Sequence, residues 1–254
     1  MKYAEIEEAL ELPGLRLVLT AGVPGPWGEA AKAIFHVKRL SYTPVRQSPG
    51  ENAELLRRAT GQTGAPVAFY QDERPRSGWA EILLLAERLA PEPALVPRDA
   101  GGRAQLFGLA HEICGEQGFG WCRRLMMFAR GLPPGARPEP GSLPWKYGGD
   151  DPAALAGASA RVGQILALLA AQLHAQRAAG RRFLVGEQLS ALDLYWAAFA
   201  AMVEPLPPDL CPMPDWMRPL YQLSSWPDAE PADPALLEHR DRVMREFLPL
   251  PLDF

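Results

Sequence analysis

Hydrophobic and polar positions follow two different patterns along the chain. In the first third, short apolar runs alternate with segments of helical spacing. Residues 15–20 and 65–70 are typical of buried strands, and residues 41–46 of an edge strand, because Pro44 cannot donate to a sheet ladder. Helical spacing predicts a helix after each strand, over residues 25–40, 49–61 and 78–90. The order strand, helix, strand, helix, strand, helix predicts a small layered α/β domain over residues 1–90, with a short N-terminal extension.

The rest of the chain shows only helical patterns. A proline-rich stretch over residues 91–100 is typical of a linker. Beyond it, spacing or length predicts helices over residues 103–132, 151–180, 190–204 and 233–248. Residues 101–254 are therefore predicted to form an all-helical domain. Gly131–Pro152 is too rich in proline and glycine to be helical, and both a lid and a simple connector remain open for it.

Composition and charge exclude several classes of function. The chain has 254 residues, a formal net charge of −4 and an isoelectric point near 5.7, so no basic surface for nucleic acid is expected. Three cysteines without CxxC spacing predict neither disulfides nor a metal site. The acidic start has no apolar signal core, and the apolar run at residues 194–203 is too short to span a bilayer. We expect a cytoplasmic protein with no membrane or nucleic-acid partner.

Ser190 and Asp193 stand three residues apart, just before an apolar run. This spacing is typical of a capping box at a helix start, in which the serine accepts from the first turn and the acid reaches back. We expect Asp193 to stabilise the fold and not to touch a substrate.

Two short motifs match known catalytic patterns only in part. His111 and Glu112 begin an HExxH pattern, but Gly115 stands where the second histidine is needed. Residues 239–241 match a kinase HRD triplet, but no glycine-rich phosphate loop accompanies them. Both are predicted to be charged helix surface.

The α/β first part, the strand beginning Ala-Pro-Val at residue 65 and the segment FLVGEQLSALDLYWAAFA at residues 183–200 together carry a resemblance. The chain resembles the cytosolic glutathione transferase superfamily as an atypical member, and residues 186–193 are the most specific match. The resemblance covers nearly the whole chain. It implies a thioredoxin-like domain followed by a helical domain, a homodimer, glutathione as co-substrate, a small hydrophobic molecule as second substrate and a detoxifying role.

The resemblance also implies where glutathione binds. Pro66 is expected to be cis, with Ala65 pairing with the backbone of the tripeptide. The γ-glutamyl end is expected at a helix start, which is Ser77-Gly78 in one register and Gly78-Trp79 in the other. The acidic residue that the family carries before this helix is missing in both registers. Arg76 is a candidate bidentate partner for the ligand carboxylate, and an ordinary solvated turn remains the alternative.

The sulfur of glutathione needs a group that stabilises a thiolate. The family commonly uses Tyr, Ser or Cys beside the start of the first helix, but the matching positions are Gly25 and Gly28. The remaining candidates are the Thr20 hydroxyl, the Trp27 indole and the helix N-terminus near Gly28. The lack of a cysteine here excludes a glutaredoxin-like exchange mechanism.

The second substrate is expected against the helical domain, where Phe119, Trp121, Met126 and Met127 offer apolar surface. Core packing is the alternative for some of these side chains. The missing thiol-activating group leaves three possibilities open: a glutathione transferase-like enzyme, a non-catalytic ligand-binding or scaffold protein on the same fold, and a protein that takes another thiol or an anionic ligand.

Overall fold

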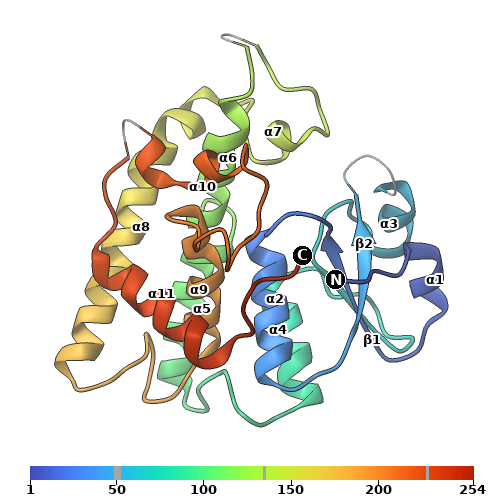
Figure 1. The fold of residues 1–254 in the computed structure, drawn as a ribbon, viewed down its shortest axis with the longest axis horizontal. Coiled ribbons are helices and arrows are strands. Elements are labelled where there is room, and N and C mark those ends of the chain that lie inside the picture. Colours follow the sequence, from blue (N-terminus) through green and yellow to red (C-terminus); the bar gives the residue numbers. More distant parts are fainter. Residues whose placement is uncertain (49–52, 134–135, 227–228) are drawn as a thin grey trace. The chain divides into compact units, whose positions relative to one another are not determined.

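The computed structural model describes residues 1–48, 53–133, 136–226 and 229–254 (Figure 1). The chain forms two compact units. Unit 1 consists of Met1–Val96, Leu206–Pro214 and Val243–Phe254, and unit 2 of Pro97–Pro205 and Asp215–Arg242. Two segments of the predicted helical domain thus belong to unit 1, a difference from the boundaries that sequence pattern suggests.

Unit 1 is built on a three-stranded sheet. Strand β1 (Leu15–Thr20) lies between β2 (Thr43–Gln47) and β3 (Val67–Tyr70), parallel to β2 and antiparallel to β3. All three strands were expected, and β2 lies at the edge as Pro44 predicts. The carbonyl of Pro44 accepts a 2.9 Å hydrogen bond from Ala4, so the N-terminal segment pairs with the outer side of β2.

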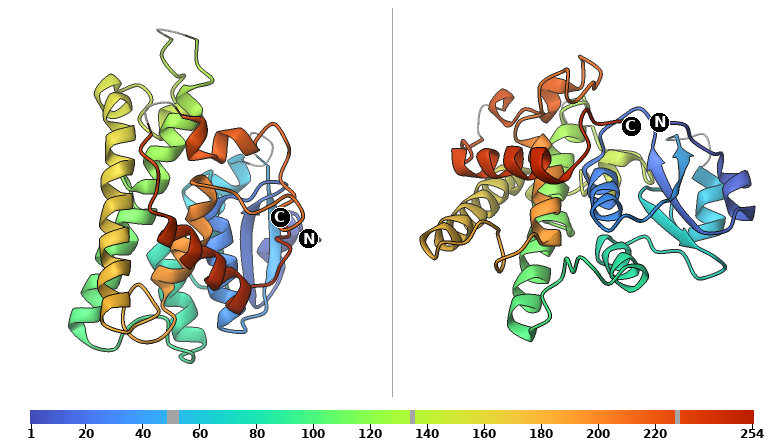
Figure 2. Two further views of the ribbon diagram at one scale, coloured as in Figure 1. Left: turned by 60° about the vertical axis from the view of Figure 1, so that its left-hand side comes forward. Right: turned by 60° about the horizontal axis from the view of Figure 1, so that its bottom comes forward.

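Four helices cover the two faces of this sheet. Helices α2 (Pro26–Val37) and α4 (Trp79–Leu89) lie on one face, and α1 (Ile6–Glu11) and α3 (Ala53–Thr60) on the other (Figures 1 and 2). The predicted helix at residues 49–61 matches α3, although its first four residues lie outside the described part of the chain. Helix α1 was not predicted. A core beneath α1 and α3 contains the buried residues Ile6, Ala9, Val18, Val45, Leu56, Val67 and Phe69.

Polar contacts explain why residues from the end of the sequence belong to unit 1. The Leu252 amide donates to the carbonyl of Leu210 over 2.8 Å, and the Lys32 ammonium on α2 donates to the carbonyl of Asp253 over 2.5 Å. The tail after the last helix therefore closes onto unit 1.

Lys38 fixes the end of α4. Its side chain is fully buried and its ammonium lies 2.5 Å from the Glu87 carboxylate. The same ammonium donates to the carbonyls of Ala90 and Pro93, at 2.7 and 2.9 Å. A buried ammonium with three oxygen partners is well compensated, so the predicted linker starts from a fixed anchor.

Unit 2 is helical in its described residues. Its helices are α5 (Ala100–Cys114), α6 (Phe119–Ala129), α7 (Leu143–Lys146), α8 (Pro152–Ala178), α9 (Ala191–Phe199), α10 (Arg218–Tyr221) and α11 (Pro234–Phe247), of which α11 crosses into unit 1 after Arg242; short 3-10 turns cover Ala200–Met202 and Leu223–Ser225. Every residue of α9 is buried, which makes it the central helix of the unit.

The predicted helix at residues 103–132 is two helices, because the chain breaks between α5 and α6. A Cβ atom on Gly118 would stand 2.7 Å from the carbonyl oxygen of Glu112 and 2.8 Å from that of His111. Only glycine fits where one backbone approaches another this closely. Hydrophobic spacing continues across the break and does not reveal it.

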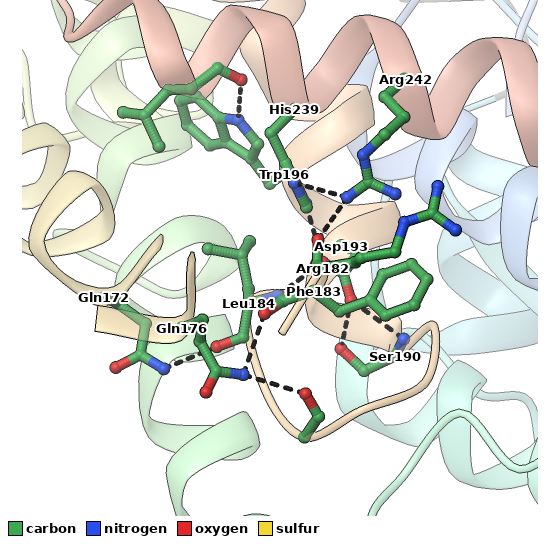
Figure 3. A network of polar contacts seen from close by, with 12 residues as sticks. Gln172, Gln176, Arg182, Phe183, Leu184, Ser190, Asp193, Trp196, His239 and Arg242 are labelled. Atoms are coloured by element: carbon green, nitrogen blue, oxygen red, sulfur yellow. Dashed lines mark hydrogen bonds and ion pairs between the residues drawn. The ribbon is translucent and has the colours of Figure 1, made fainter. Parts of the chain in front are cut away.

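The capping box at α9 forms as predicted. Asp193 is fully buried, and its carboxylate accepts from the Ser190 amide at 2.9 Å, the Ser190 hydroxyl at 2.7 Å and the Leu184 amide at 2.9 Å (Figure 3). The side-chain amides of Gln172 and Gln176 on α8 donate hydrogen bonds to carbonyls of the loop that precedes α9. The expectation that Asp193 stabilises the fold is confirmed.

His239 and Arg240 were expected on a charged surface, and that expectation is wrong. They are 1% and 4% exposed. His239 packs against the Asp193 carboxylate, and Arg240 donates to the carbonyl of Glu204 over 2.5 Å. Their buried partners lie 46 and 36 residues away in sequence, so local pattern could not indicate them. His111, the other expected surface histidine, is exposed.

Helix α8 has the length and the apolar composition that a helix needs to cross a bilayer, and a third of its most apolar stretch is buried. A core helix of a soluble protein passes the same test. The buried side of α8 contains Val162, Ile165, Leu166, Leu169 and Leu173.

Candidate functional site

The start of α2 presents main-chain donors. Gly25 is the N-cap and Pro26 the first helical residue, while the Glu29 amide donates back to the Gly25 carbonyl. No hydrogen bond among the described residues uses the Gly28 amide. A Cβ atom on Gly28 would lie 3.1 Å from the Leu19 side chain, so the helix start packs closely on β1. A free amide at the positive end of a helix is suited to an anion such as a thiolate.

The two side-chain candidates for holding sulfur differ in their surroundings. The Thr20 hydroxyl donates its single proton to the Gln47 side-chain oxygen over 2.7 Å. A sulfur beside Thr20 would have to replace Gln47 as the acceptor. Trp27 is half-buried at the second position of α2, and its role as a donor stays a prediction.

Glu29 is a charged group near this helix start that the sequence analysis did not single out. Its carboxylate is almost fully buried and lies 2.9 Å from the Lys32 ammonium. Burial raises the pKa of Glu29, and Lys32 opposes the rise. Burial, and then the charge of Glu29, also raises the pKa of Tyr42. The Glu29–Lys32 spacing of three residues was the available signal.

The turn before β3 has the predicted geometry. The peptide bond between Ala65 and Pro66 is cis, as expected. The main-chain groups of Ala65, a half-buried residue, make no hydrogen bond within the described part of the chain. Next to β3, Arg76 pairs with Ala68 through two main-chain hydrogen bonds of 2.8 and 2.9 Å, which form a rudimentary fourth strand.

The start of α4 already holds a carboxylate. One oxygen of Glu81 accepts from the amides of Ser77 and Gly78, at 3.3 and 3.2 Å, and the other lies 3.1 Å from the Arg74 guanidinium. Burial raises the pKa of Glu81, but the two amides and Arg74 outweigh it, so the pKa is lowered. Glu81 stands third in α4, a common position for an acid that reaches back to a helix start. The amides expected for the ligand are therefore occupied from within the chain.

Arg76, the candidate partner for a ligand carboxylate, is also engaged. Its guanidinium lies 2.9 Å from the Glu73 carboxylate and donates to the carbonyl of Arg74. Glu73 is shared with Arg88, at 2.6 Å. The turn is therefore tied by ion pairs, and Arg76 would have to leave Glu73 to take a ligand. Trp79 begins α4 and is half-buried.

The apolar residues expected to line a substrate pocket are divided by burial. Phe119 is fully buried, with its ring 5.7 Å from that of Trp196, which favours the alternative of core packing for this residue. Met126 and Met127 are 8% and 6% exposed. Trp121 is only partly buried and packs edge to face on Tyr147 at 4.8 Å. Trp121 is therefore the best placed of the four to meet a ligand.

Cysteine and metal chemistry find little support in the geometry. Cys114 is buried, and burial raises its thiol pKa well above the usual value, as expected for a small core residue. Within residues 1–48, 53–133, 136–226 and 229–254, no three His, Cys, Asp or Glu side chains cluster in a way that would hold a metal ion.

A thioredoxin-like α/β unit together with an all-helical unit defines the glutathione transferase fold, as the resemblance implies. Solved structures confirm this fold. A glutathione S-transferase from Methylobacterium radiotolerans in complex with glutathione sulfonate is 19% identical, with a TM-score of 0.61 and 91% of each chain covered. The Tau class enzyme MiGSTU from mango, Mangifera indica, is 19% identical, with a TM-score of 0.61 and 93% of each chain covered.

A third structure, a glutathione S-transferase from Methylobacillus flagellatus with glutathione bound, is 16% identical and has a TM-score of 0.62, covering 92% of this chain and 96% of its own. No family model matches the chain, and no curated protein sequence matches it. At these identities the similarity is one of fold.

Proposed function

We propose that the protein is a glutathione transferase-like enzyme, in which the thiolate of bound glutathione attacks a small hydrophobic electrophile. A sulfur–carbon bond forms, and the electrophile releases its leaving group. A cytoplasmic homodimer with a detoxifying role fits this proposal. The proposed enzyme activity is supported by the fold and by two similar structures that contain glutathione or glutathione sulfonate.

The observation that carries the proposal is the uncommitted Gly28 amide at the start of α2. A thiolate placed there would gain a hydrogen bond and the favourable end of the helix dipole without needing a side chain. Thr20 and Trp27 are the side chains proposed to assist. Stabilising the anion lowers the pKa of the thiol, which raises the fraction of reactive thiolate at neutral pH.

Main-chain groups supply most of the proposed contacts to the rest of the tripeptide. Ala65, beside Pro66, has main-chain groups that make no hydrogen bond with any residue the structure describes, and these groups suit an extended peptide. Ser77, Gly78 and Trp79 at the start of α4 are proposed to face the γ-glutamyl end, with Arg76 as a further partner. Glutathione would have to displace Glu81 from the Ser77 and Gly78 amides.

A second function, that of a non-catalytic ligand-binding or scaffold protein, is favoured by other observations. Gly25 and Gly28 have no side chain to donate, Thr20 has its proton on Gln47, and Glu81 fills the start of α4. These features would weaken both thiolate activation and ligand binding.

Retention on immobilised glutathione, with elution by free glutathione, is the first test. Turnover of 1-chloro-2,4-dinitrobenzene and of cumene hydroperoxide is the second. Binding with turnover is the expected result. Binding without turnover would support the non-catalytic function, and the absence of both would refute a role for glutathione.

The pKa of the bound thiol, read from thiolate absorbance, identifies the stabilising group. Trp27→Phe keeps a ring but removes the indole N–H, and Thr20→Val removes the hydroxyl at equal size. If the Gly28 amide and the helix dipole dominate, neither substitution shifts the thiol pKa by much. A large rise in one variant would assign the role to that side chain.

A further inference from the structure

Helix α6 and its C-cap residue concentrate positive charge that has no acidic partner among the described residues. Arg123, Arg124 and Arg130 lie within eight residues, and α6 contains no Asp or Glu. None of the three forms an ion pair with any residue that the structure describes. These arginines form a local positive region in a chain whose net charge is −4.

The positive charge of Arg123 is compensated by main-chain carbonyl oxygens. It is fully buried, and it donates to the carbonyls of Met202 at 2.9 Å, Leu220 at 3.1 Å and Tyr221 at 3.3 Å. Its guanidinium also lies 5.1 Å from the Trp226 ring centroid. Arg123 therefore anchors residues 220–226 to α6 and is not available to a ligand.

Arg124 is different because most of its donors are uncommitted. Its guanidinium is half-buried and donates once, to the Tyr221 hydroxyl at 2.8 Å. Its other N–H groups find no acceptor among the described residues, and they are not closed off from solvent. Holding Tyr221 needs one of the five donors that arginine has.

Aromatic rings surround this guanidinium. Trp121 and Phe128 are three residues before and four residues after Arg124, so all three side chains share one face of α6. The guanidinium lies 5.8 Å from the Phe128 ring centroid and 5.3 Å from that of Tyr221. Tyr147, just after α7, packs on Trp121 at 4.8 Å and on Phe128 at 5.6 Å.

Electrostatics within α6 favour an anion at this position. Burial, and then the neighbouring charge of Arg124, lowers the pKa of Arg123 to about 10. An anion beside Arg124 would offset that repulsion. A carboxylate matches the planar fork of a guanidinium, and a flat ring attached to it would lie against the aromatic side chains.

We propose that Trp121, Arg124, Phe128 and Tyr147 form a binding site for an aromatic carboxylate. Arg124 pairs with the carboxylate through its uncommitted donors, and the partly buried rings of Trp121, Phe128 and Tyr147 contact the aromatic part of the ligand with their accessible edges. The site lies within unit 2, and the proposal does not depend on whether unit 1 binds glutathione.

The test compares 2-naphthoate with its neutral amide, 2-naphthamide, by titration calorimetry on the whole protein. The two probes have the same ring system and differ in charge. The wild-type protein is expected to bind the acid at least about tenfold more tightly, because pairing with a charged group adds strong hydrogen bonds. Equal binding of the two probes, or no binding of the acid, would overturn the proposal.

Variants locate the effect. Arg124→Gln is expected to abolish the preference for the acid while leaving binding of the amide unchanged. Arg103→Gln is the matched control, because Arg103 is an exposed arginine 4.9 Å from the Phe107 ring on α5. The control variant is expected to keep the preference for the acid. Loss of the preference in Arg103→Gln, or its persistence in Arg124→Gln, would refute the assignment of the carboxylate to Arg124.

Tyr221→Phe separates binding from structural support. It removes the hydroxyl that Arg124 holds and leaves the guanidinium in place, so the preference for the acid is expected to persist. If Tyr221→Phe loses the preference together with thermal stability, Arg124 is a structural clamp. Arg124→Lys, which keeps the charge but not the fork, is expected to retain part of the preference and covers the case in which Arg124→Gln does not fold.

Discussion

The Nε2 atom of His239 lies 2.8 Å from the Oδ1 atom of Asp193 in the core of unit 2 (Figure 3). On the other side of the ring, Nδ1 lies 3.0 Å from the Arg242 guanidinium, which can only donate. Nδ1 is therefore the acceptor, and Nε2 carries the proton that His239 gives to Asp193. This contact joins α11 to the capping box of α9.

His239→Ala is expected to lower the free energy of unfolding by about 2–3 kcal/mol, because it removes a hydrogen bond to a buried carboxylate and leaves a cavity. Asp193→Ala is expected to cost more, since it leaves four donors without their acceptor. Urea unfolding measures both. His111→Ala, at an exposed histidine, is the control and is expected to change little; equal effects at the two histidines would contradict this account.

Gly118→Ala is expected to destabilise the protein by about 1–3 kcal/mol, because the new methyl group would meet backbone oxygens that cannot move aside. The matched control is Gly108→Ala on α5, where nothing lies within 4 Å of the added Cβ. That substitution is expected to stabilise by about 0.5–1 kcal/mol through helix propensity. Thermal unfolding of the two variants should therefore shift in opposite directions, and a shared direction would argue against the close approach at Gly118.

The pH dependence of stability is expected to involve Glu29. Burial raises its pKa above the ordinary value of 4.5 in the folded chain, despite the opposing effect of Lys32. The folded state then binds more protons than the unfolded state, so the free energy of unfolding falls as pH rises from 4.5 through the folded-state pKa. Glu29→Gln removes this dependence.

Urea unfolding of wild type and Glu29→Gln at pH 4.5 and pH 7 measures that effect. The variant should lose less stability over this interval. Glu7→Gln, at an exposed acid on α1, serves as the control and should follow the wild type. An equal loss of stability in Glu29→Gln and wild type would show that Glu29 titrates alike in the folded and unfolded states.

Glu81→Ala is expected to raise the affinity for glutathione by about two- to fivefold, because a carboxylate at a helix start contributes about 0.3–1 kcal/mol and the ligand would no longer compete with one. The prediction rests on the proposed binding of the γ-glutamyl end at Ser77 and Gly78. The dipeptide Cys-Gly lacks that end, so its affinity should not change. Glu8→Ala controls for net charge, and a gain for both peptides in Glu81→Ala would contradict the competition.

Sequence patterns that act locally predicted much of the fold. Apolar runs located the three strands, Pro44 placed β2 at the edge, and the spacing of Ser190 and Asp193 indicated the cap of α9. The break at Gly118 was not predicted, because a glycine in a helical pattern does not reveal which backbone passes beside it. The burial of His239 depends on a partner 46 residues away, which periodicity does not encode.

In the candidate site, the positions of the main-chain groups could be predicted better than the partners of the side chains. The cis turn at Ala65 and Pro66 was expected from the family resemblance, which also pointed to the helix starts at Gly28 and Gly78. The occupation of Ser77 and Gly78 by Glu81, and of Arg76 by Glu73, depends on how side chains share partners once the turn has closed. The sequence could not decide between a pocket wall and the core for Phe119, because an apolar residue in a helical pattern suits both equally well.

Unit 1 is completed by Leu206–Pro214 and Val243–Phe254, which follow most of unit 2 in the sequence. On a ribosome that adds about 5–20 residues per second, the sheet of unit 1 would emerge on the order of ten seconds before the tail that supplies the main-chain partner of Lys32. Until then the Lys32 ammonium would lack its carbonyl partner at Asp253. The nascent chain must therefore hold an incomplete α/β unit while the helices are being synthesised, and this interval is when it would depend most on chaperones.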